Sequence, residues 1–368
     1  MPNVSNRLPE LFREQARGCA KLRSPLTAAL LFAAADDLEA GGVTAAVMAG
    51  AERDRDGTVP GLRFAGALHR LVLEGRAPEL ARHYPTVGGE PDLDRLWADT
   101  VPVLENNVAE LRERIRSTVV QTNEPGRSAP LYGGLLVASQ RAAAAAGRAE
   151  PFPVCLLELG ASGGLNLRPH RVALRVPGVG VLGDPDSPLQ FDPEWTGLPQ
   201  ADLTRPLQLV ERAACDVNPV DVTSREGRLH LSSFVWADQL DRWNRLQAAL
   251  RLAATDPVPV ERAGGPDWLA EALRRERRGV LTVVWHSVVW QYVSPADRAR
   301  GREVVAAAAA RATHDAPLAL LVYESRRAES GGYRFDLLLR LWPAGLSLRL
   351  GSGGGHGTPF TWKERVWD

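Results

Sequence analysis

The hydrophobic pattern divides the chain near residue 150. Before that point, apolar residues recur at the spacing of amphipathic helices, most clearly over residues 62–73 and 93–115. Pro25 and Gly41 mark the first turn and the end of another such helix. The first apolar run that is typical of a strand comes only later. The pattern therefore predicts an all-helical region over residues 1–150.

Beyond residue 150, short apolar runs alternate with helical segments. The runs are rich in valine and leucine and lie at residues 154–159, 207–215, 258–262, 280–285 and 318–323. Strands that alternate with helices form a mostly parallel sheet, covered by helices on both faces. Around Pro343–Gly345 the pattern becomes one of alternating apolar and polar residues, which predicts an antiparallel hairpin. We expect an α/β domain over residues 151–368, with a Rossmann-like sheet closed by this C-terminal hairpin.

Residues 168–206 interrupt the alternation. They are rich in proline and glycine, and they are too many for an ordinary strand–helix connection. We therefore expect an insertion, a hairpin flap after the first helix of the domain. Asp184 and Asp186 within it suit two tight turns better than a divalent ion, so no metal ligand is predicted.

The charge and cysteine content exclude several classes of protein. Lysine and arginine together number 44, as do aspartate and glutamate, whereas a nucleic-acid-binding protein normally has a basic excess. The three cysteines are widely separated, which fits a reducing compartment and gives neither a disulfide framework nor a cysteine zinc site. No uncharged apolar run approaches the ~20 residues of a membrane span. We expect a cytoplasmic protein that binds neither nucleic acid nor membrane.

The first predicted strand ends in a glycine-rich turn, VCLLELGASGGLNL at residues 154–167. Gly160–Gly164 satisfies G-x-S-x-G, the turn that presents a nucleophilic serine, and His286, His314 and His356 follow it in the chain. Strand order argues against a hydrolase, because the serine of that fold follows several strands and this one follows the first. Ser162 is better explained as a small residue in a tight turn.

The same turn resembles the first loop of methyltransferases that use S-adenosylmethionine (SAM). Their template is acid-x-G-x-G-x-G, which Glu158, Gly160 and Gly164 fit, with Ser162 at the middle glycine. A carboxylate at the strand end can hold the ammonium group of SAM, and glycines let the backbone approach its amino-acid part. A dinucleotide loop fits less well, since serine and leucine replace its second and third glycines, and a P-loop lysine is absent.

Polar residues after the later strands extend this interpretation. Asp216 ends the second strand, where an acid accepts hydrogen bonds from ribose hydroxyls in such sheets. Asp238 is a candidate for the adenine side, and Asp267 competes with it. His286 leaves a later strand at the edge where α/β sheets bind ligands, so it is a candidate base near neutral pH. Its alternative role is packing or capping at a helix start.

A polar segment before the first strand, QTNEPGRS at residues 121–128, is dense in hydrogen-bonding groups. It is either a capped loop between helices or a lid over the cofactor site. The candidates for catalysis are His286, Glu124 and Tyr292, and those for substrate binding are Asn123, Arg127, Asn166, Trp236, Trp290 and Gln291. For the tryptophans, core packing is the competing explanation.

Several of these motifs occur in a recognisable order along the chain. They are QTNEPGRSAPL, LELGASGGLNL, GDPDSPL, ERAACDVNPVD, FVWADQ, VVWHSVVWQYVSP and the closing His356, Gly357 and Trp362. Together they resemble the bacterial domain of unknown function 2332 family, from the N-terminal helices to the C-terminal hairpin. The resemblance implies a sheet like that of class I SAM-dependent methyltransferases, and it implies no specific reaction.

Three functions are compatible with these residues. The first is methyl transfer from SAM to a small molecule, with the cofactor held by Glu158, Gly160, Ser162, Gly164, Asp216 and Asp238. The second keeps the scaffold for base-assisted ring closure or elimination in specialised metabolism, with His286 or Glu124 as the base. The third is a non-catalytic partner of another enzyme, and a protein partner or a homo-oligomer is compatible with the balanced charge.

Overall fold

The chain forms two compact units. The computed structural model describes residues 7–51, 59–327 and 333–367. The first unit, called the helical unit here, consists of the chain up to residue 122 and residues 224–247; the second, the sheet unit, consists of residues 123–223 and 248–368.

This division differs from the predicted boundary at residue 150. The helix α8 (Ser128–Ala145) was expected in the helical region, yet it packs within the sheet unit, where its Gly134 lies against Leu321 and Leu337 of the sheet. The local hydrophobic pattern predicts that α8 is helical, but it does not predict which distant segment the helix packs against.

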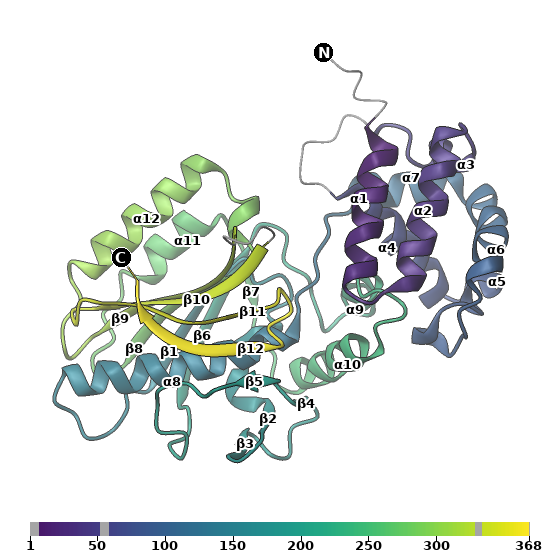
Figure 1. Cartoon of the computed structure of the whole chain (residues 1–368). Coiled ribbons are helices and arrows are strands. Elements are labelled where there is room, and N and C mark those ends of the chain that lie inside the picture. Colours follow the sequence, from purple (N-terminus) through teal and green to yellow (C-terminus); the bar gives the residue numbers. More distant parts are fainter. Residues whose placement is uncertain (1–6, 52–58, 328–332, 368) are drawn as a thin grey trace. The chain divides into compact units, whose positions relative to one another are not determined.

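Helices alone make up the described part of the helical unit. They are α1 (Leu8–Lys21), α2 (Pro25–Glu39), α3 (Val43–Val47), α4 (Pro60–Leu73), α5 (Pro78–Ala81), the 3-10 turn Pro85–Val87, α6 (Leu93–Asn106), α7 (Val108–Ser117), α9 (Arg225–Ser233) and the start of α10 (Leu240–Thr255) (Figure 1). Their apolar faces meet in one core around Phe12, Leu31, Phe64 and Leu68, which are fully buried. The predicted N-terminal helical region is thus confirmed.

The start of α2 is capped by a distant carboxylate. Asp238 accepts hydrogen bonds from the Ser24 hydroxyl and, at 2.8 Å, from the Leu26 backbone N–H. The first backbone N–H groups of a helix have no partner within the helix, so an acceptor at this position stabilises it by about 1 kcal/mol. Asp238 therefore has a structural role in the helical unit.

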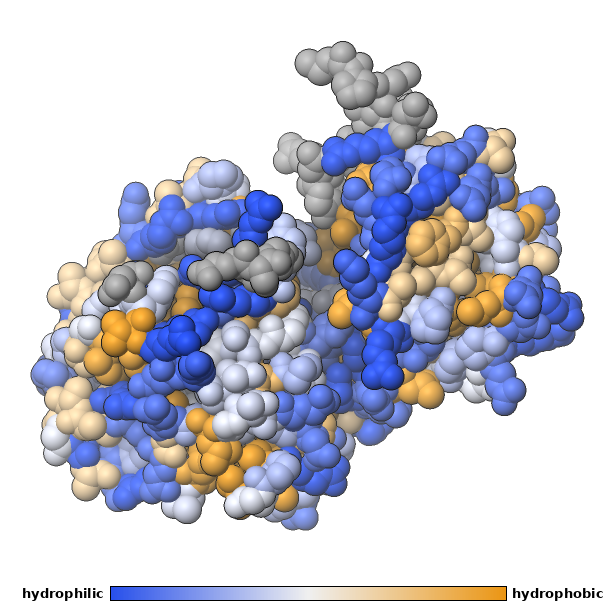
Figure 2. All heavy atoms as spheres, in the orientation of Figure 1, coloured by the Kyte–Doolittle hydropathy of each residue, from blue (hydrophilic) through white to orange (hydrophobic). Residues whose placement is uncertain are grey.

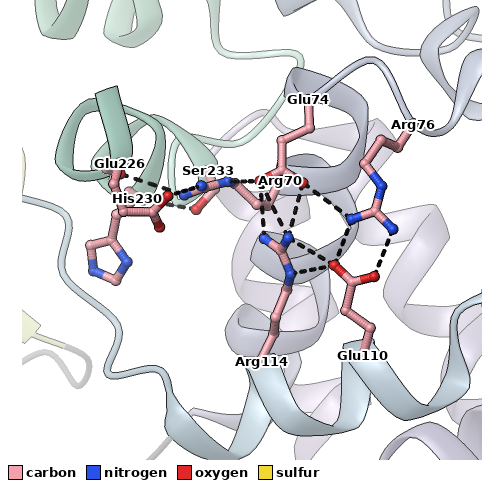
Figure 3. A network of polar contacts seen from close by, with 8 residues as sticks. All are labelled: Arg70, Glu74, Arg76, Glu110, Arg114, Glu226, His230 and Ser233. Carbon is pink, nitrogen blue, oxygen red and sulfur yellow. Dashed lines mark hydrogen bonds and ion pairs between the residues drawn. The ribbon is translucent and has the colours of Figure 1, made fainter. Parts of the chain in front are cut away.

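A chain of ion pairs joins α4, α7 and α9 of the helical unit (Figure 3). Glu74 accepts hydrogen bonds from Arg70 at 2.5 Å and from Arg114 at 2.9 Å. Glu110 in turn binds Arg114 and Arg76. The Glu74 side chain is only 13% exposed. Its ion pairs with Arg70 and Arg114 are therefore less screened by water than ion pairs at the surface.

The sheet unit is built on one nine-stranded sheet. Its parallel strands are β1 (Val154–Leu159), β6 (Leu209–Asp216), β7 (Val260–Arg262), β8 (Leu281–Ser287) and β9 (Leu318–Arg327), in the spatial order β7-β6-β1-β8-β9. Antiparallel strands β10 (Tyr333–Trp342), β11 (Leu346–Gly353) and β12 (Phe360–Val366) continue the sheet beyond β9, and the short β5 (Trp195–Thr196) ends it. The mixed α/β fold and the C-terminal hairpin, β10–β11, are as predicted.

Helices cover the two faces of this sheet unequally. One face packs on α11 (Gly265–Ala272) and α12 (Pro295–Ala309), whose Leu269 and Val305 share a core with Leu157 and Val284. The opposite face packs on α8, which lies on the other side of the sheet from α12 in Figure 1. Side chains of successive strand residues therefore enter two different environments.

The segment after β1 differs from the expected strand–helix unit. It forms two 3-10 turns, Leu165–Leu167 and Pro169–Arg171, in place of a first helix. Pro169 has no N–H group to continue helical hydrogen bonding. The predicted hairpin within residues 168–206 is present: β2 (Ala173–Val176) pairs with β3 (Gly180–Gly183), and β4 (Gln190–Phe191) completes a small sheet.

The face of the molecule drawn in Figure 2 is mostly hydrophilic. In the view of Figure 2, hydrophilic residues cover most of both units, and apolar residues appear in scattered patches. Single exposed apolar residues are ordinary on protein surfaces. Among the described residues, no helix combines the length and the apolar character that crossing a membrane requires.

The variant Glu74→Gln should destabilise the protein by about 1–3 kcal/mol at neutral pH, because Arg70 and Arg114 lose a buried anionic partner. Burial alone would raise the pKa of Glu74. The hydrogen bonds and charges of the two arginines together outweigh burial, so the pKa lies below the ordinary 4.5. The contribution of Glu74 is therefore present above about pH 4.5 and is lost as the pH falls.

Chemical denaturation followed by circular dichroism measures the difference between wild type and variant, which should shrink as the pH is lowered from 7. Glu10→Gln is the matched control, since its ion pair with Arg17 is half exposed and should contribute less than about 0.5 kcal/mol. Equal losses in the two variants would contradict the role given to Glu74.

Candidate functional site

The strand order of the sheet unit changes direction at β1. From β1 the chain passes to β6 and β7 on one side and then to β8 and β9 on the other. Open α/β sheets bind ligands at such a switch point, in the crevice outside the carboxyl ends of the strands. The loops after β1, β6 and β8 therefore mark the candidate site.

The loop after β1 is held by the end of β6. The backbone N–H of Ser162 donates to Asp216 at 2.8 Å, and that of Asn218 donates to the other oxygen of the same carboxylate, also at 2.8 Å. Gly160, Ser162 and Gly164 all have positive φ, of 67°, 54° and 66°. Ser162 thus keeps a left-handed conformation where the template has a glycine, at a cost of about 1 kcal/mol.

Part of the predicted lid segment lies directly on this loop. The side-chain oxygen of Asn123 accepts hydrogen bonds from the backbone N–H groups of Gly163 at 3.1 Å and Leu165 at 3.2 Å. Asn166 accepts one from the Ser128 hydroxyl. The sequence therefore identified two segments that meet in the structure, although it could not show that Asn123 binds the loop itself.

Glu124 and Arg127 belong to the same buried corner. Glu124 accepts a hydrogen bond from the Gly126 N–H and so begins a 3-10 turn. The Arg127 guanidinium donates to the carbonyl oxygens of Gly355, at 3.0 Å, and Ser287, at 3.5 Å. Arg127 therefore brings a positive charge to the ends of β8 and β11.

The loop after β8 closes over the glycine turn. A Cβ atom at Gly160 would come within 2.3 Å of the Val289 side chain, so glycine is needed there for Val289 to pack. The preceding residue, Val288, has a φ of 53°, which is a strained conformation for a β-branched residue. Asn123, Ser162 and Val288 thus bring three left-handed non-glycine residues to one crevice, and strain of this kind clusters at functional sites.

Glu158 is the most unusual group of the crevice. It is 2% exposed, and its Oε2 atom has no hydrogen-bond partner among the described residues. Trp285 is its neighbour across the β1–β8 pairing, and the indole N–H of Trp285 is likewise unpaired within the described structure. Burial raises the pKa of Glu158 to about 8, against the opposing effects of Trp285, Arg127 and Arg168.

His286 points to the other face of the sheet. It is paired in register with Leu159, one residue after Glu158, and consecutive strand residues alternate between faces. Its Nδ1 atom lies 2.7 Å from Glu324 of β9, and its ring stacks on Trp290 at 4.9 Å. The structure therefore does not bring the candidate base together with Glu158.

Glu324 is the residue that sequence reasoning missed. Besides contacting His286, its Oε1 atom accepts hydrogen bonds from the backbone N–H groups of Val289 and Trp290. The signal available was its position: an acid that follows the apolar run LALLVY near the carboxyl end of a strand. The same rule had selected Asp216 after β6.

The remaining candidates make other contacts. Trp236 and Asp238 belong to the helical unit, and Asp238 is the cap of α2, a long-range role that its sequence neighbours do not reveal. The competing Asp267 is exposed and binds Arg300. Gln291 and Tyr292 lie in an exposed 3-10 turn after β8. No cluster of three or more metal-binding side chains occurs within the described ranges.

Comparison with known proteins gives one family. The sequence pattern of the family described as "uncharacterized protein conserved in bacteria (DUF2332)" matches residues 9–362. No curated protein and no solved structure matches the chain significantly.

The variant Glu158→Gln should stabilise the protein relative to wild type at high pH. The pKa of Glu158 is about 8 in the folded state, and its ordinary value is 4.5. The favourable contribution of the neutral Glu158 side chain to the free energy of unfolding is therefore complete below about pH 4.5. It is lost as the pH rises towards 8. Glutamine does not titrate, so the variant should gain about 2–5 kcal/mol on wild type over this interval.

Denaturation midpoints measured from pH 5 to pH 8 provide the test. Glu211→Gln is the control of opposite sign, since hydrogen bonds from Arg277 lower the pKa of Glu211. Wild type should be more stable than Glu211→Gln at neutral pH, and this difference in stability should disappear at acidic pH. A flat difference for Glu158→Gln would show that Glu158 is not buried in its neutral form.

Proposed function

Since the chain belongs to the bacterial DUF2332 family, whose description states no activity, we propose from the crevice itself that it is a SAM-dependent methyltransferase acting on a small molecule. The observation that carries the proposal is the Glu158 carboxyl group, which is buried at the end of β1 and whose Oε2 atom has no hydrogen-bond partner among the described residues. Buried polar atoms in folded proteins normally have a partner, so an orphaned one calls for a ligand or an ordered water.

The groups around Glu158 suit the amino-acid part of SAM, which carries an ammonium group and a carboxylate. Its Oε2 atom can accept a hydrogen bond from an ammonium group. The positive charges of Arg127 and Arg168 act on Glu158 and lower its pKa against the effect of burial. A bound cation would favour the ionised form of Glu158, whose pKa is otherwise raised by burial.

Asp216 suits the ribose of the same ligand. Each of its two oxygens accepts one backbone hydrogen bond, and a carboxylate has about four acceptor positions. Capacity therefore remains for a pair of neighbouring hydroxyl groups. The backbone bonds also fix the carboxylate, so that little side-chain entropy is lost on binding.

One feature of the crevice requires movement. Val289 occupies the space next to Gly160, where the backbone of such loops approaches the cofactor. Binding therefore displaces the segment around Val288 and Val289, whose strained backbone already raises the energy of its present conformation.

The chemistry divides between cofactor and protein. SAM supplies an activated methyl group, and the residues of the crevice bind it, align it with the acceptor and exclude water. His286 is not part of this assignment, because its ring lies on the opposite face of the sheet from Glu158.

Isothermal titration calorimetry with SAM and S-adenosylhomocysteine tests the proposal. Both should bind wild type, and Asp216→Asn should weaken binding by tenfold or more, because the ribose loses a charged acceptor. Asp202→Asn is the matched control: Asp202 also accepts the N–H two residues ahead, in an exposed turn of the same unit, and its variant should bind as wild type does.

Absence of binding at millimolar concentrations of both compounds would overturn the proposal. Thermal unfolding of Asp216→Asn checks that a lost signal does not reflect a lost fold. The product formed from SAM in the presence of small-molecule extracts then identifies the reaction. S-adenosylhomocysteine would support methyl transfer, whereas methylthioadenosine would show that SAM loses its aminocarboxypropyl group and would contradict methyl transfer.

A further inference from the structure

A cavity of about 470 Å³ lies on the face of the sheet that Glu158 does not reach. Its floor is formed by β8, β9 and β10, and its wall by α11 and α12. The apolar lining comes from Leu159, Leu269, Val284, Val305, Leu320, Val322, Leu338, Trp342 and Trp367. A volume of this size is within the range of small-molecule sites, which are typically apolar with a few placed polar groups.

The carboxyl ends of β8 and β9 contribute the polar groups of the cavity's inner end. His286 and Glu324 line it and are hydrogen-bonded to each other, and Trp290 stacks on His286. Glu324 also accepts two backbone N–H groups. The Glu324 carboxylate is therefore already hydrogen-bonded to the ring and to the loop after β8.

Three arginines, each exposed to solvent, line the same cavity: Arg302 of α12, Arg326 of β9 and Arg340 of β10. Within the described ranges, no carboxylate lies at ion-pair distance from any of the three, whereas Arg171, Arg212 and Arg277 elsewhere in the sheet unit are each paired. The guanidinium groups of Arg326 and Arg340 lie over the Trp367 ring, at 5.1 and 4.7 Å from its centre. The cavity thus combines apolar walls with an excess of positive charge.

We propose that this cavity is a binding site for an amphipathic anion, a molecule with an apolar chain or ring body and a carboxylate or phosphate at one end. The body removes apolar surface from water against the strands and α12. The charged end pairs with the arginines, because guanidinium groups bind carboxylate and phosphate in the same forked geometry. The cavity is separate from the proposed SAM site, because it opens on the face of the sheet opposite Glu158.

Binding of four probes with the same alkyl chain tests the proposal: decanoate, decyl phosphate, decanol and decylamine. Fluorescence of the lining tryptophans and calorimetry report binding to the full chain. Decanoate or decyl phosphate should bind at least tenfold more tightly than decanol, and decylamine most weakly. The better of the two anions distinguishes a carboxylate site from a phosphate site.

Two kinds of variant locate the site. Arg302→Met and Arg340→Met should each weaken anion binding by about tenfold and leave decanol binding unchanged. Arg300→Met is the matched control on the same helix, since Arg300 binds Asp297 and Asp267 instead of facing the cavity, and it should change nothing. Ala306→Phe, at a cavity-lining position of α12, should abolish binding of all probes while thermal unfolding shows an intact fold.

Equal affinity for decanol and decanoate would overturn the anion site, and so would binding that survives Ala306→Phe. Light scattering gives the oligomeric state of wild type and of Ala306→Phe. A dimeric wild type and a monomeric variant would show that a second copy of the chain occupies the cavity instead. SAM binding in calorimetry should be the same with and without Ala306→Phe, so a failure of this inference and a failure of the proposed function are separate results.

Discussion

The register between β1 and β8 is the constraint on which the rest of the sheet unit depends. It pairs Glu158 with Trp285 and Leu159 with His286. Because side chains alternate between faces, a step of one residue sends the buried acid to one side of the sheet and the histidine to the other. Glu158 and His286, the buried acid and the candidate base near the switch point, therefore lie on opposite faces of the sheet.

Each site is closed by contacts between segments that are far apart in sequence. On the side of Glu158, Asn123 and Asp216 hold the backbone of the glycine turn. On the side of His286, the carboxylate of Glu324 binds both the ring and the next loop. Backbone groups that would otherwise be left without partners are satisfied by side chains, and this allows strained conformations such as that of Ser162 to persist.

The hydrophobic pattern predicted the parts of the fold that depend on local sequence. The run at residues 154–159 is β1, and the alternation around Pro343–Gly345 is the β10–β11 hairpin. The pattern failed where distant contacts decide. A helix was expected after β1, where two 3-10 turns form. Asp238, a candidate for the adenine side, caps α2, and His286 lies on the opposite face of the sheet from Glu158. Pairing between strands fixes which face a residue occupies, and a single strand's sequence shows only that its faces alternate.

The loop after β8 is common to both faces. Val289 packs on Gly160 beside Glu158, while the N–H groups of Val289 and Trp290 bind Glu324 beside His286. Moving Val289 away from the glycine turn therefore stretches or breaks the bonds that order the other site. A ligand that displaced Val289 from the glycine turn would therefore also disturb Glu324 on the opposite face, and an effect of one site on another is what coupling between sites means. Val288, with a φ of 53°, thus lies in the segment that contacts residues on both faces of the sheet.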